Sequence, residues 1–122
     1  MEIKYTETSG TYRVYTKQSN YESRDEYDGI ASLLWLSDKE VYLYGALTTD
    51  DIGFHFLIYI LDDLIKRGVQ LVRLTRASKR KIPFGKLIAD HGVEKEWEID
   101  ISDNTIINKV NKLYAKIQMS GM

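Results

Sequence analysis

Residues 41–75 constrain the fold more than any other stretch, because they predict a strand, a helix and a second strand in immediate succession. Residues 41–47 alternate apolar and other side chains as a strand does. The helix that follows ends before Gly68, the residue type best suited to the left-handed position after a helix. Residues 70–75 then form the next strand. Two strands joined by one helix in so short a span imply parallel strands with a right-handed connection.

The predicted helix, residues 52–67, begins beside the side-chain oxygens of residues 48–51, which can accept hydrogen bonds from its first N–H groups. Its apolar face is expected to pack across the sheet. That face consists of Phe54, Phe56, Leu57, Ile58, Ile60, Leu61, Leu64 and Ile65. A polar stripe consists of His55, Tyr59, Asp62 and Lys66. We expect this stripe to face solvent; alternatively, His55 belongs to a ligand pocket, because helix N-termini attract anions.

The N-terminal third is predicted from shorter patterns. Residues 2–8 alternate as a strand that Ser9 and Gly10 would end, and residues 11–29 suggest a short helix with a long loop. Residues 30–36 form a strongly apolar strand that joins the strand at 41–47 through a compact polar turn. This arrangement predicts an antiparallel hairpin.

The C-terminal part predicts a helix, a strand and a final helix. Residues 82–91 place Phe84, Leu87 and Ile88 at helical spacing, with Pro83 tolerated in the first turn and Gly92 ending the helix. Residues 93–101 alternate as a strand, and Asp103 can cap the last helix. The apolar face of that helix is Ile106, Ile107, Val110, Leu113, Tyr114 and Ile117. The whole order indicates a single α/β domain, residues 1–122, with a mixed sheet flanked by helices.

Composition excludes several classes of function. A net charge of −1 provides no general attraction to nucleic acid or membranes. The chain has no cysteine and two histidines, so we expect no disulfide, no thiolate nucleophile and no metal site. The first residues do not resemble a signal peptide, and no apolar run approaches membrane-spanning length. We therefore expect a cytoplasmic protein.

Three stretches carry a resemblance to a known family: residues 53–58 (GFHFLI), 65–69 (IKRGV) and 86–93 (KLIADHGV). In element order and spacing, residues 30–101 resemble the second half of the GCN5-related N-acetyltransferase (GNAT) superfamily. The chain is also similar to the degenerate acetyltransferase-like proteins of tailed phages, which would place it in the host cytoplasm or the virion. The resemblance implies a strand leading into a helix that cradles the pyrophosphate of acetyl-CoA or another acyl-CoA, with an amine as acyl acceptor.

The resemblance also implies particular site residues. Asp51, Ile52, Gly53 and Phe54 would surround the phosphates. The family's phosphate loop reads Gln/Arg-x-x-Gly-x-Gly/Ala, and with Gly53 at its last position Asp51 replaces the middle glycine. A carboxylate about 4 Å from a phosphate would cost roughly 1–4 kcal/mol, although this aspartate can instead cap the helix dipole.

Candidates for proton transfer differ from the family pattern. Ile88 takes the position of the tyrosine that many members use as general acid. Tyr59 and His91 are alternatives for that acid, and His55, Glu40 or a water molecule for the general base.

A basic cluster lies between the strand at 70–75 and the following helix. It consists of Arg73, Arg76, Lys79, Arg80 and Lys81. We expect residues 76–81 to lie at the start of that helix, at the carboxyl edge of the sheet, where ligands collect in open α/β folds. The cluster, Lys79, Arg80 and Lys81 above all, could contact cofactor phosphates; alternatively, it binds a polyanion or forms a solvated turn paired with the acidic face of residues 94–98.

Three functions are compatible with these patterns. The first is an acyl-CoA-dependent N-acyltransferase with a cleft between the strands at 41–47 and 70–75. The second is a non-catalytic protein of the same fold that serves in virion assembly or contacts a host protein. The third is a small protein that masks a nucleic acid or an enzyme. The final helix could cover the sheet or dock a second subunit in a homo-oligomer.

Overall fold

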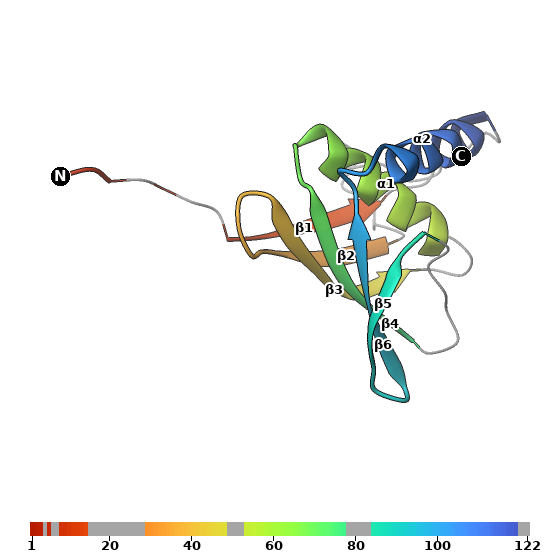
Figure 1. The fold of residues 1–122 in the computed structure, drawn as a ribbon, viewed down its shortest axis with the longest axis horizontal. Coiled ribbons are helices and arrows are strands. Elements are labelled where there is room, and N and C mark those ends of the chain that lie inside the picture. The colour runs from red at the N-terminus through yellow and green to blue at the C-terminus, as the bar shows by residue number, and fades with distance from the viewer. Residues whose placement is uncertain (4, 6–7, 15–28, 49–52, 78–83, 120–122) are drawn as a thin grey trace.

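The computed structural model describes residues 1–3, 5, 8–14, 29–48, 53–77 and 84–119. The strands are β1 (Ser9–Val14), β2 (Gly29–Trp35), β3 (Glu40–Thr48), β4 (Leu71–Ala77), β5 (Lys86–Asp90) and β6 (Glu94–Asp100), and the helices are α1 (Gly53–Lys66) and α2 (Asn104–Met119). The strands form one sheet in the order β1-β2-β3-β4-β6-β5 (Figure 1). Only β3 and β4 pair in parallel, and the other neighbours are antiparallel. The predicted mixed α/β sheet is confirmed.

The β3–α1–β4 unit matches its sequence prediction. Pairing of Val41 with Val72 confirms that the two strands are parallel neighbours. Helix α1 ends where Gly68 adopts a φ of 82°, and the Val69 N–H donates to the Leu64 carbonyl at 3.1 Å. This bond satisfies a carbonyl at the helix end that has no partner within the helix. The chain can therefore turn directly from α1 into β4.

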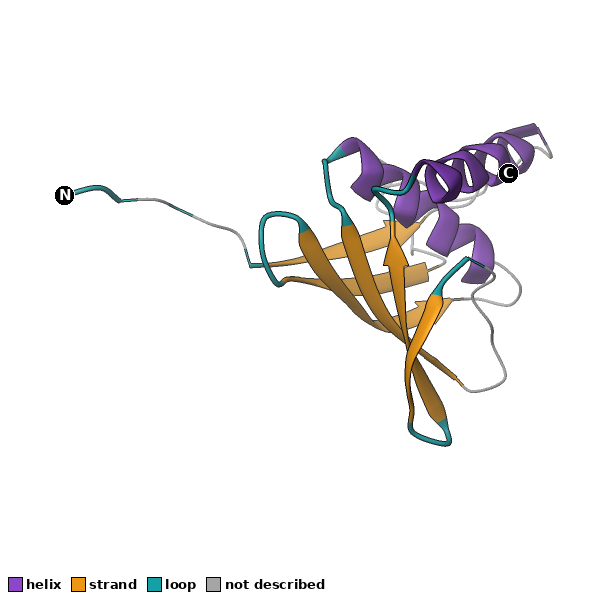
Figure 2. Ribbon diagram, viewed as in Figure 1, coloured by secondary structure: helices purple, strands orange, loops and turns teal. Residues whose placement is uncertain are grey.

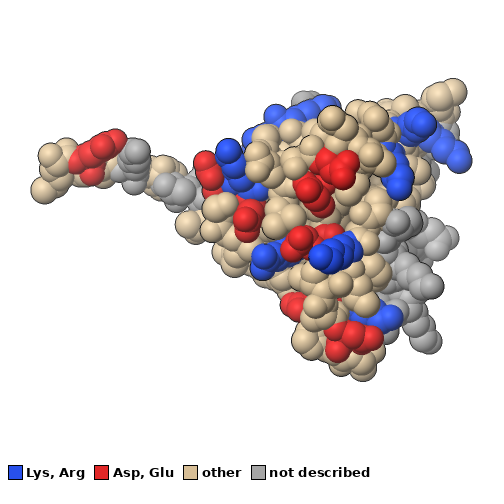
Figure 3. Space-filling model, in the orientation of Figure 1, with Lys and Arg blue, Asp and Glu red and all other residues tan. Residues whose placement is uncertain are grey.

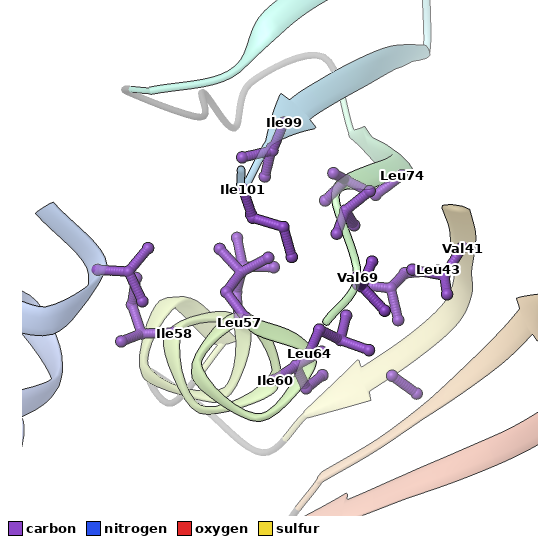
Figure 4. Close-up of a cluster of buried hydrophobic side chains, with 14 of the residues drawn as sticks. Val41, Leu43, Leu57, Ile58, Ile60, Leu64, Val69, Leu74, Ile99 and Ile101 are labelled. Atoms are coloured by element: carbon purple, nitrogen blue, oxygen red, sulfur yellow. The ribbon is translucent and has the colours of Figure 1, made fainter. Parts of the chain in front are cut away.

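Both helices lie on the same side of the sheet, and α2 lies against α1 (Figure 2). Leu57 and Leu64 point from α1 toward Ile101, which directly follows β6, and Val69, which precedes β4, whereas Ile58 points toward α2 (Figure 4). Leu61 and Leu64 are fully buried. The molecule thus has three layers, with α1 in the middle, and the predicted packing of α1 on the sheet is confirmed.

The prediction that the polar stripe of α1 faces solvent holds for Lys66, whose side chain is 68% exposed, but is wrong for Tyr59 and Asp62. Asp62 is only 8% exposed and forms an ion pair with Lys66 at 2.9 Å. The ring of Tyr59 meets Tyr114 of α2 edge to face, with 5.2 Å between centroids. The predicted apolar face of α2 is what covers this stripe, because Val110 and Ile117 are buried. Helix α1 therefore has contacts on its front and its back.

Two element predictions are also wrong. The predicted strand at residues 2–8 is absent where the structure describes it, and the first strand is β1, which includes the Ser9 and Gly10 expected to end it. Residues 11–14 of the predicted helix and loop also belong to β1, whereas 15–28 lie outside the described residues.

In place of a helix at residues 82–91, the structure has the edge strand β5, whose Leu87 pairs with Trp97. Ile88 lies at an irregularity in that pairing. A short apolar run is compatible with either a helix or a strand, and here its pairing with β6 makes it a strand.

The remaining predictions agree with the structure. Strands β2 and β3 form the predicted hairpin, and β6 lies within the predicted strand at 93–101. The Asp103 carboxylate accepts a hydrogen bond from the Thr105 N–H at 2.8 Å, as a helix cap does. No helix in the described ranges has the length and apolar character to cross a membrane. Cationic and anionic side chains are interspersed on the face in Figure 3.

A polar contact ties the first strand to the middle layer. The Tyr12 hydroxyl donates to Asp63 Oδ2 at 2.7 Å, and Arg67 Nε donates to the same oxygen at 2.7 Å. Burial and the hydrogen bond to Asp63 raise the pKa of Tyr12 above its usual range. Burial alone would raise the pKa of Asp63, but the hydrogen bonds from Tyr12 and Arg67 outweigh it and lower the pKa.

This contact makes a prediction about acid stability. Because the pKa of Asp63 is lower in the folded state, its contribution is present above about pH 4, the usual aspartate range, and is lost as the pH falls through the folded value. Asp63→Asn is expected to flatten the acid side of a plot of unfolding free energy against pH, and Tyr12→Phe to flatten it less. Chemical denaturation between pH 2 and 7 measures both; identical acid slopes in all three proteins would contradict this role.

Candidate functional site

The two parallel strands separate before either of them ends. Their pairing runs from Glu40 with Leu71 to Leu43 with Leu74. Beyond that point β3 continues to Thr48 and β4 to Ala77. Within the described residues, the facing edges of these two strand ends do not pair with each other, so the sheet is open between them. We call this separation the splay.

A β-bulge in β3 accompanies the splay. Ile30 pairs with Leu47, whereas Ser32 pairs with Tyr44, so β3 carries one extra residue between these positions. A bulge bends its strand and increases the local twist, and bulges are frequent beside active sites. This bulge begins directly after the last residue of β3 that pairs with β4. It therefore gives a local cause for the divergence of the two strands.

On the side of the sheet that carries the helices, two features lie near the splay. Helix α1 begins at Gly53, shortly after β3 ends, so its first N–H groups lie beyond the carboxyl end of that strand. Trp97 pairs with Leu74, the last residue of β4 that pairs with β3. Its Nε1 is a buried donor that has no hydrogen-bond partner in the described part of the chain. A buried donor left in this state costs about 1–3 kcal/mol, which a ligand acceptor would recover.

The opposite side of the sheet, which we call the outer face, carries polar side chains at the same place. The Tyr42 and Thr75 hydroxyls form a hydrogen bond of 2.7 Å from β3 to β4. Thr75 pairs with Glu96 of β6, whose Oε2 lies 3.2 Å from His91 Nε2. Tyr44 stacks on Tyr42 with 5.8 Å between ring centroids. Two hydroxyl groups therefore lie where the two strands part, with the Glu96 carboxylate on the neighbouring strand and the His91 imidazole beyond it.

The sequence-predicted site residues are only partly brought together. Gly53, Phe54 and His55 occupy the first turn of α1, and His55 is partly buried. Tyr59 lies one turn further along, under α2, and its hydroxyl accepts a hydrogen bond from Gln118 at 3.4 Å. Asp51, Ile52, Lys79, Arg80 and Lys81 lie outside the described residues.

Other candidates have definite positions. Arg76 lies in β4 opposite Lys95, not at the start of a helix as expected. Arg73 is paired with Glu98 at 3.7 Å, so the predicted contact of the basic cluster with the acidic face is confirmed at this one residue. Glu40 begins β3, at the opposite end of the strand from the splay.

Four residues at the splay are not among the sequence-predicted site residues: Tyr42, Thr75, Glu96 and Trp97. Each has an ordinary place in a strand pattern, and nothing local marks it. What distinguishes them is their position beside the last paired residues of β3 and β4. Pairing register is a long-range property, so the signal appears only when the strands are aligned.

Known structures share this arrangement of strands and helices. A Klebsiella pneumoniae protein assigned as an acyl-CoA N-acyltransferase is 9% identical, with 77% of this chain and 73% of that chain covered and a TM-score of 0.58. GCN5 of Tetrahymena is 8% identical, with 79% and 70% covered and a TM-score of 0.52. A Bacillus subtilis acetyltransferase in complex with CoA is 11% identical, with 76% and 77% covered and a TM-score of 0.51.

No protein-family model matches the sequence, and no curated protein matches it significantly. The likeness is thus one of fold. The chain has the fold of the GCN5-related N-acetyltransferases, as its sequence resemblance implied. In each of the three comparisons, the alignment with this chain covers at least 70% of the other protein.

Proposed function

We propose that this chain is an acyl-CoA-dependent N-acyltransferase. The observation that carries the proposal is the splay, where the parallel pairing of β3 and β4 stops at Leu43 and Leu74 although both strands continue. Two strand ends that diverge instead of pairing with each other suit an extended ligand with amide groups, which can form backbone hydrogen bonds as a further strand would. The pantetheine arm of CoA is such a ligand.

The residues around the splay suit the other parts of an acyl-CoA. The start of α1 favours phosphate through the positive end of the helix dipole, and Gly53 allows close approach of a ligand to the backbone. The buried Trp97 Nε1 needs an acceptor, which a carbonyl oxygen would supply. When bound, the cofactor supplies an acyl group activated as a thioester. The chain's own part is to hold and orient this group, exclude water and receive the proton that the acceptor nitrogen loses.

Among the sequence-predicted proton carriers, His55 suits this role better than Tyr59. His55 occupies the first turn of α1, next to the end of β3. Tyr59 is engaged with Tyr114 and Gln118 of α2, which is a packing role. We therefore propose His55 as the proton acceptor and leave Tyr59 to the interface between the helices.

Acetyl-CoA is expected to raise the melting temperature of the protein. A ligand at 100 times its dissociation constant stabilises the folded state by about 2.7 kcal/mol. Thermal denaturation with and without millimolar acetyl-CoA measures this effect, and isothermal titration calorimetry gives the affinity. If millimolar acetyl-CoA produces no binding heat and no melting shift, catalysis with this cofactor is excluded.

The basic residues 79–81 provide a second test. If they bind cofactor phosphate, a Lys79/Arg80/Lys81 triple alanine variant is expected to abolish the acetyl-CoA melting shift. A Lys39/Lys109/Lys112 triple alanine variant removes the same charge from exposed positions elsewhere. Lys39 lies in the turn before β3, and Lys109 and Lys112 lie on α2. Equal losses in both variants would indicate a general electrostatic effect, and no loss in the first would remove these residues from the site.

A second function, a non-catalytic protein of this fold that binds a partner protein, is supported by Ile88. The sequence resemblance puts this residue at the family's tyrosine position in a helix, but it lies on the edge strand β5, where it is 42% exposed. Isoleucine cannot donate a proton. Binding of acetyl-CoA with no acetylation of any primary amine in a panel would favour this second function over the first.

A further inference from the structure

The hydroxyl pair on the outer face spans the splay at its origin. Tyr42 is paired with Arg73, so its hydrogen bond to Thr75 reaches diagonally across to the first β4 residue beyond the parallel ladder. Either hydroxyl can be the donor in this bond. Each oxygen still has lone pairs that can accept a hydrogen bond from a third group. The pair therefore offers acceptors, and no positive charge, at the mouth of the splay.

Glu96 provides a negative charge beside this pair. Its cross-strand neighbours, Thr75 and Ala89, are both neutral. Its contact is with His91, an imidazole that carries a charge only when protonated. The side chain of Glu96 is 36% exposed, so its carboxylate has acceptor sites that a ligand can reach.

Glu98, two residues along the same strand and face, has the opposite surroundings. Its cross-strand neighbours are Arg73 and Lys86, and Arg73 Nε lies 3.7 Å from its carboxylate. Among the described residues, Glu98 thus has cations on both sides, whereas Glu96, nearer the splay, has neutral cross-strand neighbours. A cationic ligand would therefore supply a positive charge beside the Glu96 carboxylate.

Apolar surface extends from this point along β3 and β2. Tyr44 stacks on Tyr42 and is 43% exposed, and Leu34, which pairs with Tyr42, is 38% exposed. An aromatic ring can attract a cation through its face, and together these side chains can cover an alkyl stem. The surface therefore suits a ligand that has an apolar chain and a terminal positive charge.

We propose that Tyr42, Tyr44, Thr75 and Glu96 form a subsite for the acyl acceptor, and that it binds the ammonium group of a primary alkylamine such as a lysine side chain. This inference rests on the proposed function. The acceptor enters from the outer face, whereas the start of α1 and Trp97 approach the splay from the side that carries the helices. The two substrates thus reach the splay from opposite sides of the sheet.

The probe for this subsite is Nα-acetyl-lysine methylamide. Its binding is measured by NMR chemical-shift titration of isotope-labelled protein. We expect the resonances of Tyr44, Thr75 and Glu96 to move. The norleucine analogue, which has a similar stem and no ammonium group, should leave them unmoved. Because a hydrogen bond to a charged group is worth about 1.5–3 kcal/mol, Glu96→Gln is expected to weaken binding about tenfold or more.

Glu98→Gln is the matched control, because it removes the same charge from the same face of β6 and is expected to change affinity by about twofold or less. The melting temperatures of both variants report whether they fold as the parent does. A lysine probe that moves only resonances of other regions would overturn the subsite. Glu96→Gln binding as tightly as the parent, or both variants losing affinity equally, would overturn it as well.

Acetyl-CoA binding separates this inference from the function on which it rests. The melting shift caused by acetyl-CoA should be the same in Glu96→Gln and in the parent. An acetyl-CoA shift with no lysine binding would retain the proposed function and remove the subsite. Lysine binding with no acetyl-CoA shift would support the subsite and overturn the acyltransferase.

Discussion

Replacing Leu61 by alanine is expected to lower the free energy of unfolding by about 2–5 kcal/mol. Leu61 is fully buried in the middle of α1. The substitution removes apolar atoms from the core and leaves a cavity that the surrounding side chains can fill only in part. The neighbouring layers limit that collapse, because the sheet lies on one side of α1 and α2 on the other.

Urea denaturation at neutral pH measures this change, and Leu36→Ala is its matched control. Leu36 is 46% exposed in the turn between β2 and β3, so the same chemical change should cost about 0.5 kcal/mol or less. Similar losses at the two positions would contradict the assignment of α1 to the middle layer. A smaller m value, the slope of unfolding free energy against urea concentration, would show that the alanine variant also changes the denatured or native state.

The β3–α1–β4 unit could be predicted from sequence because its signals are local. Strand alternation, a helical apolar face and Gly68 agree with one another within a short stretch, and the parallel pairing follows from chain connectivity. The same holds for the hairpin of β2 and β3 and for α2. In each of these elements, a single segment contains both the pattern and the residue that ends it.

The elements at the two edges of the sheet could not be predicted in this way. β5 is assigned by its pairing with β6, and β1 by its pairing with β2. Neither segment has a strong period of its own, and Phe84, Leu87 and Ile88 fit a helical spacing as well as a strand. Partners distant in sequence decide such segments, because pairing energy outweighs weak local preference.

The candidate site depends on two long-range properties that no local pattern contains. One is the register at which β3 and β4 stop pairing, and the other is the register that aligns Glu96 with Thr75. The resemblance to the acetyltransferases predicted a site at the start of α1, which follows the end of β3. It did not identify the outer face, because Tyr42 and Thr75 become neighbours only through the parallel ladder.

The prediction for the polar stripe of α1 failed at Tyr59 and Asp62 for a different reason. A helix with polar residues on one side usually exposes that side, but α2 brings its own apolar face to it. The polar atoms are accommodated in pairs, with Asp62 bonded to Lys66 and the Lys66 ammonium 5.6 Å from the Tyr114 ring centroid. The stripe is therefore a helix–helix interface with polar groups in it.

This interface makes a strong prediction at Val110, which is fully buried on α2. Val110→Asp is expected to cost about 3–5 kcal/mol, because an unpaired carboxylate would be placed in the core or α2 would have to leave α1. Denaturant unfolding gives the total loss. Amide hydrogen exchange distinguishes the two routes, since detachment of α2 would reduce protection in α2 while β3 and β4 remain protected.

Asn108→Asp is the control, because it introduces the same side chain into the same helix at an exposed position. Both variants introduce the charge and the helix propensity of aspartate into α2. A difference in their stabilities therefore reports the burial of position 110. We expect its cost to stay at about 0.5 kcal/mol or less. If Val110→Asp were equally mild and α2 kept its protection, α2 would not be part of the core, and the polar stripe of α1 would face solvent as its sequence suggests.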